Sequence, residues 1–297
     1  MDATSASLRK RLLSLAYGYL GTLAEAEDLV QEALLRLQQS DPHSIRNAEA
    51  WLTTVVTRLA LDKLRSAGYR RELYTGEWLP EPVVTGFDGD DPLAAVVAAD
   101  DARFAAMVVL ERLTPDQRVA FVLHDGFGVP FGEIASVLGV SDASARQLAS
   151  RARRAVASAP PPVSHDTHNE VAGSLLAALA NADMEAVVRL LHPDITYTGD
   201  ANGRAPTAAR VIRGPDKVAR FLLGLARRYG PNWLSSSQLA LINGQLGSYA
   251  VGAAARDNYP AMAPRVTAMT VRDGKVCALW DIANPDKFTG SPLGRRS

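Results

Sequence analysis

Apolar residues recur at helical spacing through the first 72 residues of the chain, and the pattern predicts three helices. Gly21 and Thr22 separate the first helix from the second. A polar loop then precedes a third helix, which runs from about Glu49 to Ser66. The apolar positions are Leu8, Leu12, Leu15, Tyr19, Ala26, Leu29, Val30, Ala33, Leu37, Leu52, Val55, Val56 and Leu59. Residues 1–72 are therefore expected to form one helical module.

A second helical module is expected over residues 101–159. One packed helix ends near Leu113, and Thr114 and Pro115 start the next with an N-cap residue and a proline at the first helical position. Two further helices follow within residues 129–157, joined by a three-residue turn. The turn consists of Gly139, Val140 and Ser141. Two helices joined by so short a turn form a helix-turn-helix.

After residue 159 the spacing of the apolar residues along the chain changes. Residues 160–168 form a polar, proline-rich boundary. The domain expected over residues 169–297 begins with three helical segments, the third opened by Gly214-Pro215. Two hairpin signals follow between apolar runs, at Asn243-Gly244 and Asp273-Gly274. This order predicts an α+β domain in which helices pack on a curved antiparallel sheet.

The second helix of the helix-turn-helix has an apolar and a polar face. The apolar positions are Ala145, Leu148, Ala149, Ala152 and Val156. The polar face carries Ser144, Arg146, Gln147, Ser150, Arg151, Arg153 and Arg154. Donors near the start of the helix suit base edges and the later arginines suit phosphates, so this face predicts contact with DNA. The alternative is a solvated helix whose arginines only keep it soluble.

The N-terminal module carries two polar features besides its packed faces. Asp28, Gln31 and Glu32 stand three and four positions apart on the second helix and form one patch, for which ordinary solvated acids are the alternative. Basic residues outnumber acids between positions 58 and 72, which suits a nucleic-acid backbone, and the loop before the third helix is long enough to hold an unstacked base. The residues concerned are Arg46, Asn47, Arg58, Lys63 and Arg65.

Residues 73–100 are expected to form an acidic linker. The segment has six acids and no lysine or arginine, and its prolines and glycines exclude a helix from its early part. Such a chain could occupy a cationic channel or mask the basic faces of the helical modules; a solvated spacer is the alternative. The tripeptide Trp78-Leu79-Pro80 places a large aromatic residue and a leucine in this spacer, which indicates a docking site.

The composition of the chain further limits the classes of protein to which it can belong. A length of 297 residues exceeds what one hydrophobic core usually serves, and with a net charge of zero only local clustering argues for nucleic acid. Cys277 is the only cysteine, which excludes an internal disulfide and a thiolate zinc cluster. The sequence shows no signal peptide, no membrane-spanning run and no paired histidine ligands. A cytoplasmic protein with no metal and no cofactor is therefore expected.

The segments AEAEDLVQEALLRL and AWLTTVVTRLALDKLRS resemble region 2 of the extracytoplasmic-function (ECF) sigma factors, and LTPDQRVAFVLHDGFGVPFGEIASVLGVS with RQLASRARR resembles region 4. The resemblance implies an alternative sigma factor that directs core RNA polymerase, through its beta and beta-prime subunits, to promoter DNA. It implies that Asp28, Gln31 and Glu32 dock on the polymerase clamp. Region 2 would engage the melted −10 element and region 4 the upstream −35 element. The DNA contacts implied are Arg46, Asn47, Arg58, Lys63, Arg65, Ser144, Arg146, Gln147, Ser150, Arg151, Arg153 and Arg154.

The C-terminal part is similar to the SnoaL-like group of the nuclear-transport-factor cone fold. This extension is found on one group of sigma factors, the SigJ-like group, which has an aspartate, three glycines and a lysine where this chain has Asp200-Ala201-Asn202-Gly203-Arg204. The resemblance implies a regulatory domain that replaces a separate anti-sigma factor by holding the two modules compactly until polymerase binds. The expected interdomain contacts are Trp78, Leu79, Pro80, Asp200, Asn284, Pro285, Asp286, Lys287 and Phe288.

Two other functions are weighed against this one. A conventional activator could use the cone to sense an unidentified small molecule, but it would have no use for the patch at Asp28. The cone could instead be an enzyme if its polar residues line a pocket and transfer protons. The residues considered are His192, Asp194, Tyr197, Asp257, Arg265 and Asp281. Turn capping and cross-strand pairing explain most of these residues equally well, so no catalysis is expected.

Overall fold

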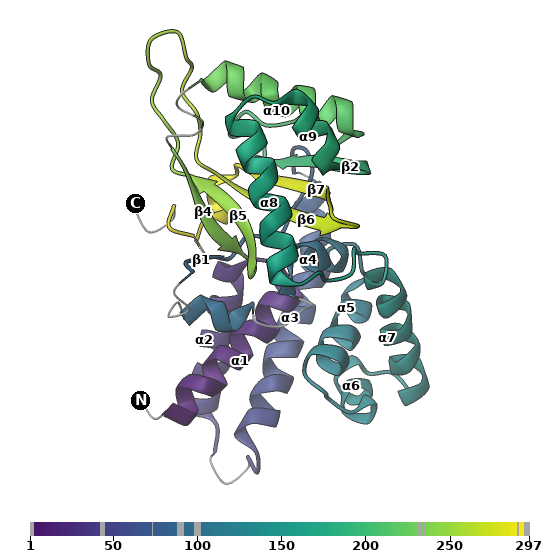
Figure 1. Cartoon of the computed structure of the whole chain (residues 1–297). Coiled ribbons are helices and arrows are strands. Elements are labelled where there is room, and N and C mark those ends of the chain that lie inside the picture. The colour runs from purple at the N-terminus through teal and green to yellow at the C-terminus, as the bar shows by residue number, and fades with distance from the viewer. Residues whose placement is uncertain are drawn as a thin grey trace. The chain divides into compact units, whose positions relative to one another are not determined.

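The computed structural model describes residues 3–41, 45–72, 74–87, 92–97, 102–230, 233, 236–289 and 291–293 (Figure 1). The chain divides into two compact units. Unit 1 comprises Met1–Leu73 and Pro92–Ala159, and unit 2 comprises Tyr74–Asp91 and Pro160–Ser297. The segment expected as one linker over residues 73–100 is thus divided between the units, and its first part folds with the C-terminal domain.

The first half of unit 1 contains three helices, α1 (Ala3–Leu20), α2 (Leu23–Gln39) and α3 (Ala48–Glu72). Gly21 ends α1 in a left-handed conformation, with φ 69°, that a β-carbon would disfavour. Tyr17 and Tyr19 are fully buried, and the hydroxyl of Tyr19 shares a hydrogen bond of 3.1 Å with Thr57. The three predicted helices and their separation by Gly21 and Thr22 are confirmed.

The second half of unit 1 forms the predicted helix-turn-helix. Its elements are η2 (Pro92–Val96), α4 (Phe104–Leu110), α5 (Pro115–Phe121), the π-helical turn η4 (Val122–Gly126), α6 (Phe131–Leu138) and α7 (Asp142–Val156). Thr114 and Gln117 form a reciprocal capping box at the start of α5. Gly139, with φ 69°, ends α6, and the Ser141 hydroxyl accepts a hydrogen bond of 3.2 Å from the Ser144 amide to cap α7.

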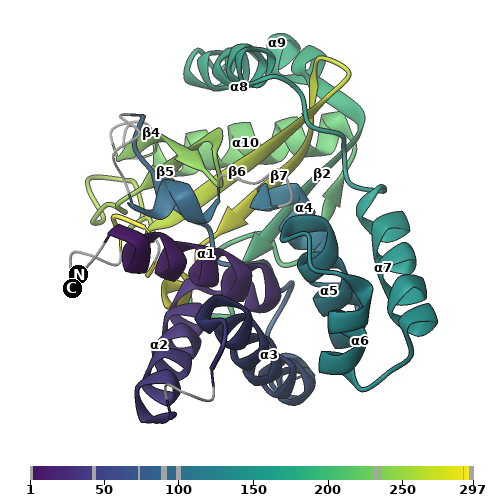
Figure 2. The same cartoon turned by 90° about the horizontal axis from the view of Figure 1, so that it is seen from below.

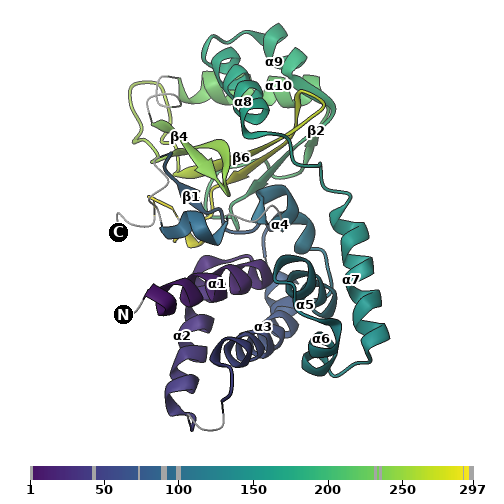
Figure 3. The same ribbon diagram turned by 60° about the horizontal axis from the view of Figure 1, so that its bottom comes forward.

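The two halves of unit 1 pack on each other, with α1 and α3 against α5, α6 and η4 (Figure 3). A β-carbon added to Gly18 on α1 would lie 3.3 Å from a methyl carbon of Val122 in η4. Glycine therefore permits the close approach of these two helices. Arg65 on α3 also forms an exposed ion pair of 3.3 Å with Asp116 on α5.

Unit 2 is an α+β domain in which α8 (His165–Ala180), α9 (Met184–Leu190) and α10 (Pro215–Tyr229) pack on a sheet (Figure 2). The sheet has the order β1-β4-β5-β6-β7-β2-β3. The strands are β1 (Val84–Thr85), β2 (Leu191–Asp200), β3 (Ile212–Arg213), β4 (Ser237–Ile242), β5 (Gln245–Ala250), β6 (Arg265–Arg272) and β7 (Lys275–Ile282), and a short η5 (Pro285–Lys287) follows. The core between the layers includes Leu175, Val218 and Leu279. The predicted α+β class is confirmed.

Both predicted hairpins are present. Asn243-Gly244 joins β4 to β5, and Asp273-Gly274 joins β6 to β7. All four turn residues have positive φ, as a type I′ turn requires. The expectation of a wholly antiparallel sheet is wrong at one point, because β2 runs parallel to β7. The returning chain between these strands includes α10, and a crossover of that kind produces a parallel pair.

The segment around Trp78 is folded onto the sheet of unit 2 and is not a free spacer. Val84 and Thr85 form strand β1 at the sheet edge, paired with Ile242 and Leu241 of β4. Residues 79–85 are all buried. We refer to residues 74–85 as the linker segment.

In the part of the chain that the structure describes, no helix combines the length and the apolar character needed to cross a membrane.

Candidate functional site

The exposed face of α2 carries the expected polymerase-binding residues. Asp28, Gln31 and Glu32 are all exposed, opposite buried residues such as Leu29. Glu32 forms an ion pair of 2.9 Å with Arg36 one turn later. Leu35 continues this face and is 45% exposed. The sequence interpretation missed Leu35, although its spacing of seven from Asp28 places it on the same face of the helix. Polar groups around one exposed apolar side chain suit a docking helix.

The expected −10 residues lie around the start and along the solvent side of α3. Arg46, Arg58 and Arg65 are exposed, and Lys63 is half-buried. Asn47 has a structural role as well, since its side-chain oxygen accepts a hydrogen bond of 3.1 Å from the Ala50 amide and caps α3. Part of the preceding loop, residues 42–44, and the side chains of residues 67–72 lie outside the described residues.

The helix α7 presents the expected −35 residues to solvent. Gln147, Ser150 and Arg151 are exposed, and so are Arg146, Arg153 and Arg154. Ser144 is half-buried and its hydroxyl lies 2.9 Å from that of Ser141, so it is largely committed to the cap. Arg153 forms an ion pair of 2.5 Å with Asp125, whereas Arg151 has no ion pair among the described residues. Arg146 lies 4.0 Å from Asp142, so of the four arginines Arg151 and Arg154 remain exposed without an ion pair among the described residues.

A groove of about 380 Å³ lies between the two modules of unit 1. Asn47, Thr54 and Arg58 line it from the N-terminal module. Phe127, Pro130 and Glu133 line it from the helix-turn-helix module. Two of the expected −10 residues therefore face the other module in this packed arrangement.

A second group of expected residues comes together in unit 2, around Asp200 at the end of β2. The Asp200 carboxylate accepts hydrogen bonds of 2.7 Å from the Leu79 amide and 2.7 Å from the Lys287 ammonium group. Lys287 also donates to the Leu79 carbonyl oxygen. The side chain of Asp200 is 0% exposed and that of Lys287 is 3% exposed. We call these contacts the linker clamp, because they fasten both backbone polar groups of Leu79.

Aromatic rings cover the linker clamp. The Lys287 nitrogen lies 3.5 Å from the centre of the Trp78 ring and 5.0 Å from that of Tyr74, so two cation–π contacts add to the ion pair. The Tyr74 hydroxyl donates to Asp200 and accepts a hydrogen bond of 2.9 Å from the Asn284 side chain. Burial, together with the neighbouring Asp200 carboxylate, raises the pKa of Tyr74, so this hydroxyl stays protonated.

The remaining expected contacts lie beside the clamp. Pro80 and Phe288 are buried, Pro285 and Asp286 are exposed, and Asp286 pairs with Arg204 at 2.6 Å. The sequence interpretation missed Tyr74, Glu81 and Asn243. Glu81 is 1% exposed and bonds to Thr289, and Asn243 exchanges two hydrogen bonds with the backbone of Val83. Tyr74 stands four residues before Trp78, and this spacing of two aromatic residues was the available signal.

The polar residues considered for catalysis do not form one site. Tyr197, Arg265 and Asp281 line a cavity of about 60 Å³ in unit 2. The hypothesis that His192, Asp194 and Asp257 share this cavity is wrong, because none of the three lines it.

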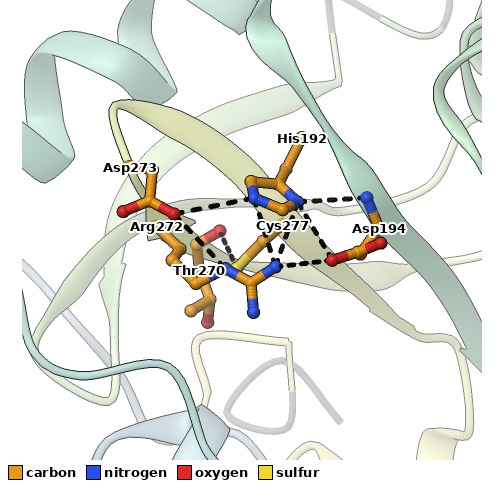
Figure 4. Close-up of polar contacts among 6 residues, drawn as sticks. All are labelled: His192, Asp194, Thr270, Arg272, Asp273 and Cys277. Atoms are coloured by element: carbon orange, nitrogen blue, oxygen red, sulfur yellow. Dashed lines mark hydrogen bonds and ion pairs between the residues drawn. The ribbon is translucent and has the colours of Figure 1, made fainter.

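His192 and Asp194 lie instead at the start of β2, beside the β6–β7 turn (Figure 4). There Arg272 is 3.0 Å from Asp194 and 3.1 Å from His192, and Asp273 is 3.7 Å from His192. Asp194 and Asp273 are both 79% exposed. These four residues therefore link the β6–β7 turn to the start of β2 at the surface of the domain.

The architecture thus defines a helix-turn-helix DNA-binding protein with a second helical module and an added α+β domain. Residues 6–70 match the model of sigma-70 region 2, and residues 103–156 match that of sigma-70 region 4. The chain is 67% identical over 293 residues to the ECF RNA polymerase sigma factor SigJ of Mycobacterium tuberculosis, covering 98% of this chain and 94% of that protein.

Two further comparisons agree. The crystal structure of the Mycobacterium tuberculosis ECF sigma factor SigJ superposes with a TM-score of 0.88 at 65% identity, covering 98% of this chain and 99% of that chain. A probable ECF sigma factor of the same species, SigI, is 34% identical over 233 residues, or 75% of this chain and 77% of that protein. The chain belongs to the family of ECF RNA polymerase sigma factors. It directs core RNA polymerase to promoters, and the sequence-based prediction of family and function is confirmed.

Proposed function

We propose that this sigma factor docks on the beta and beta-prime subunits of core RNA polymerase through the α2 face that carries Asp28, Gln31 and Glu32. The exposure of all three residues supports this assignment, and Leu35 adds an apolar contact to the same face. A protein that acts through polymerase works where polymerase works, which is the bacterial cytoplasm.

The −10 element would be contacted by residues on and before α3, and the −35 element by residues of α7. The exposure of all the proposed contact residues except Lys63 and Ser144, and the positive charge of the arginines, support both assignments. Asn47 would act through its side-chain amide nitrogen, because its oxygen already caps α3. The proposed −10 contacts are Arg46, Asn47, Arg58, Lys63 and Arg65. The proposed −35 contacts are Ser144, Arg146, Gln147, Ser150, Arg151, Arg153 and Arg154.

Reading both elements at once requires the two modules of unit 1 to separate. The elements lie about 25 base pairs apart, which is roughly 85 Å along B-DNA. A compact unit of about 140 residues has a radius of gyration of only ~14 Å. The contact between Gly18 and Val122 and the groove at Arg58 therefore belong to a closed state that cannot span a promoter.

The linker clamp gives the C-terminal domain a way to favour that closed state. Residues 74–85 connect the two modules, and while they lie on the domain they cannot extend. When these residues are released from the domain, they can extend over about 40 Å, at ~3.4 Å per residue, and so let the two modules move apart. We infer that the domain takes the place of a separate anti-sigma factor by holding this segment. The observation that carries the inference is the buried ion pair of Lys287 and Asp200 across Leu79.

Run-off transcription with sigma-free core polymerase and a promoter library tests both parts of the proposal. Lys287→Met should release the linker segment and raise promoter-dependent transcription several-fold over the unmodified chain. Arg204→Met is the matched control, because it removes an exposed ion pair of the neighbouring residue Asp286 and leaves the clamp intact. Limited proteolysis at Trp78 reports whether the segment is released. Unchanged transcription after demonstrated release would reject the regulatory part alone, and no promoter-specific transcript from any variant would reject the assigned contacts.

We also propose that the C-terminal domain performs no chemistry and needs no cofactor. The only histidine considered as a base, His192, lies away from the cavity and is held by Arg272 and Asp273. A proton-transfer site requires its base within hydrogen-bond reach of a bound substrate.

A further inference from the structure

The helix α10 carries a row of like charges on its solvent face. Its buried residues, among them Val218 and Leu222, belong to the core of unit 2. The exposed cations stand three, ten and eleven positions after the first of them, so they fall within about 100° of the helix circumference. Between positions 210 and 228 the chain has six basic residues and a single acid, Asp216. We call four of the exposed basic residues the basic stripe: Lys217, Arg220, Arg227 and Arg228.

The charges of the basic stripe are not neutralised within the described part of the chain. On three other helices an exposed arginine pairs with an acid one turn earlier, as Arg36 does with Glu32 at 2.9 Å. Arg220 also has an acid one turn earlier, Asp216, but it donates to the carbonyl oxygen of that residue at 3.1 Å. None of the four side chains of the stripe forms an ion pair with a described residue. The stripe is therefore available to an anion from outside the chain.

Helix stability explains only half of the stripe. Cations are favourable at the C-terminal end of a helix dipole, which suits Arg227 and Arg228 in the last turn. Lys217 lies in the first turn, where the dipole disfavours a cation, and Arg220 adds a like charge one turn away. A face that only kept the domain soluble would carry charges of both signs. A binding partner accounts for the two cations that the helix itself disfavours.

A glycine lies in the middle of the stripe. Gly224 follows Lys217 by seven positions, so it is on the same face of the helix, and it is exposed. A β-carbon at Gly224 would meet no atom of another part of the chain within 4 Å, so packing does not require a glycine there. Glycine stabilises a helix less than alanine does, and its use allows a partner to approach the backbone closely. The gap at Gly224 therefore points to a bulky partner.

The chemistry and the length of the stripe fit a phosphate backbone. Three of its four residues are arginines, whose planar guanidinium groups match phosphate through two N–H donors. The stripe extends about 17 Å from Lys217 to Arg228, at ~1.5 Å per residue. Duplex DNA carries one charge per ~1.7 Å of its axis. It therefore offers phosphates along the whole length of the stripe.

Two other kinds of anionic partner fit less well. A helix that lies on a membrane turns its apolar side towards the lipid, whereas Val218 and Leu222 are buried in the core of unit 2. A protein interface usually has an apolar centre, and no large apolar residue of α10 is exposed. The stripe thus favours a partner that is recognised by charge alone.

We propose that the basic stripe on α10 binds the phosphate backbone of duplex DNA without reading its sequence. This contact belongs to unit 2 and does not rest on the residues assigned to the −10 and −35 elements. Because it is tethered to the two helical modules, it raises the affinity of the whole chain for DNA through effective concentration.

Fluorescence anisotropy of the full chain with a labelled duplex that lacks promoter elements tests the proposal. Lys217→Gln combined with Arg220→Gln removes two charges of the stripe. The matched control, Arg204→Gln combined with Lys275→Gln, removes two charges elsewhere in unit 2. The stripe variant should bind at least about tenfold more weakly at about 50 mM salt, and its slope of log K against log salt should fall by about 1.8, or 0.9 per phosphate contact. The control variant should bind within about twofold of the unmodified chain.

Thermal unfolding separates this effect from a loss of structure. Because the helix dipole disfavours Lys217, the stripe variant should unfold at the same temperature as the unmodified chain or slightly above it. Equal losses of affinity in the stripe and control variants, or an unchanged slope in the stripe variant, would overturn the proposal. Binding to vesicles of phosphatidylglycerol and phosphatidylcholine that requires the stripe, while DNA binding does not, would also overturn it and make a membrane the partner.

Discussion

Lys287 and Asp200 form an ion pair of 2.7 Å although neither side chain is more than 3% exposed. Taking two charges out of water costs free energy, and the cost is offset only where good geometry and further hydrogen bonds satisfy both groups. Leu79, Tyr74 and Trp78 supply those contacts from the linker segment. The pair is therefore stable only while the segment is in place, which couples the linker to the fold of the domain.

Removal of the cation should show this coupling. We expect Lys287→Met to lower the free energy of unfolding of unit 2 by about 3 kcal/mol, because Asp200 keeps a buried charge without its partner. Urea unfolding followed by tryptophan fluorescence measures it, since Trp78, Trp233 and Trp280 all belong to unit 2. The double variant with Asp200→Asn should lose less than the two single losses together. Additive losses would show that the two residues do not act as a pair.

A reversible cross-link should test whether the closed state of unit 1 blocks initiation. Gly18→Cys combined with Val122→Cys places two thiols where the backbones already approach closely. The oxidised protein should lose promoter-dependent transcription and regain it on reduction, because region 2 and region 4 could not separate. Cys277 is buried, so it should not compete for the disulfide. Each single substitution is the control, and full activity of the oxidised double variant would mean that the modules need not part.

The charge of Arg151 should contribute to DNA affinity without regard to sequence. We expect Arg151→Ala to weaken promoter binding by the holoenzyme and to reduce the slope of log K against log salt by about 0.9, the value for one phosphate contact. Arg153→Ala should reduce the slope less, because Asp125 already neutralises part of that charge at 2.5 Å. Fluorescence anisotropy at several salt concentrations provides the slopes. An unchanged slope for Arg151→Ala would remove this residue from the interface.

His168 should make the stability of unit 2 depend on pH. The side chain is 1% exposed, and burial lowers the pKa of His168 below its ordinary value of 6.5. Below pH 6.5 the unfolded chain takes up a proton that the folded chain does not. The contribution of His168 to the free energy of unfolding is therefore fully present above pH 6.5. It is lost as the pH falls below 6.5, by at most about 1.4 kcal/mol per pH unit. Urea unfolding at pH 7.5, 6.0 and 5.0 should show a flatter profile for His168→Gln; parallel profiles would contradict the assignment.

Cys277 should react slowly in the native protein. Burial raises the pKa of Cys277 to about 11, and the thiolate is the reactive form. We expect alkylation by iodoacetamide at pH 7.5 to be at least about 100-fold slower than in urea, where the thiol regains a pKa near 8.5. Mass spectrometry over time gives both rates. Comparable rates would indicate that the strand pair around β7 opens readily.

The features that could be predicted from the sequence depend on residues close together in the chain. Ser141 caps α7 through the amide only three positions later, and Asn243-Gly244 turns a hairpin through its own backbone angles. The period of apolar residues likewise predicts which face of a helix is buried, as at Leu29. These interactions join residues that are close in the chain, so they do not depend on how the rest of the chain folds. The helices, caps, hairpins and the two sigma regions can therefore be predicted from the sequence alone.

Only the tertiary structure decided where the linker segment goes and which polar residues share a site. Leu79 bonds to Asp200 and Lys287, which are 121 and 208 positions away in the chain. Asp281 lines the cavity while His192 lies at the surface of the domain. Such pairings depend on which strands become neighbours and how deeply each group is buried. Burial and long-range pairing are properties of the packed domain, and a spacing of residues along the chain does not carry them.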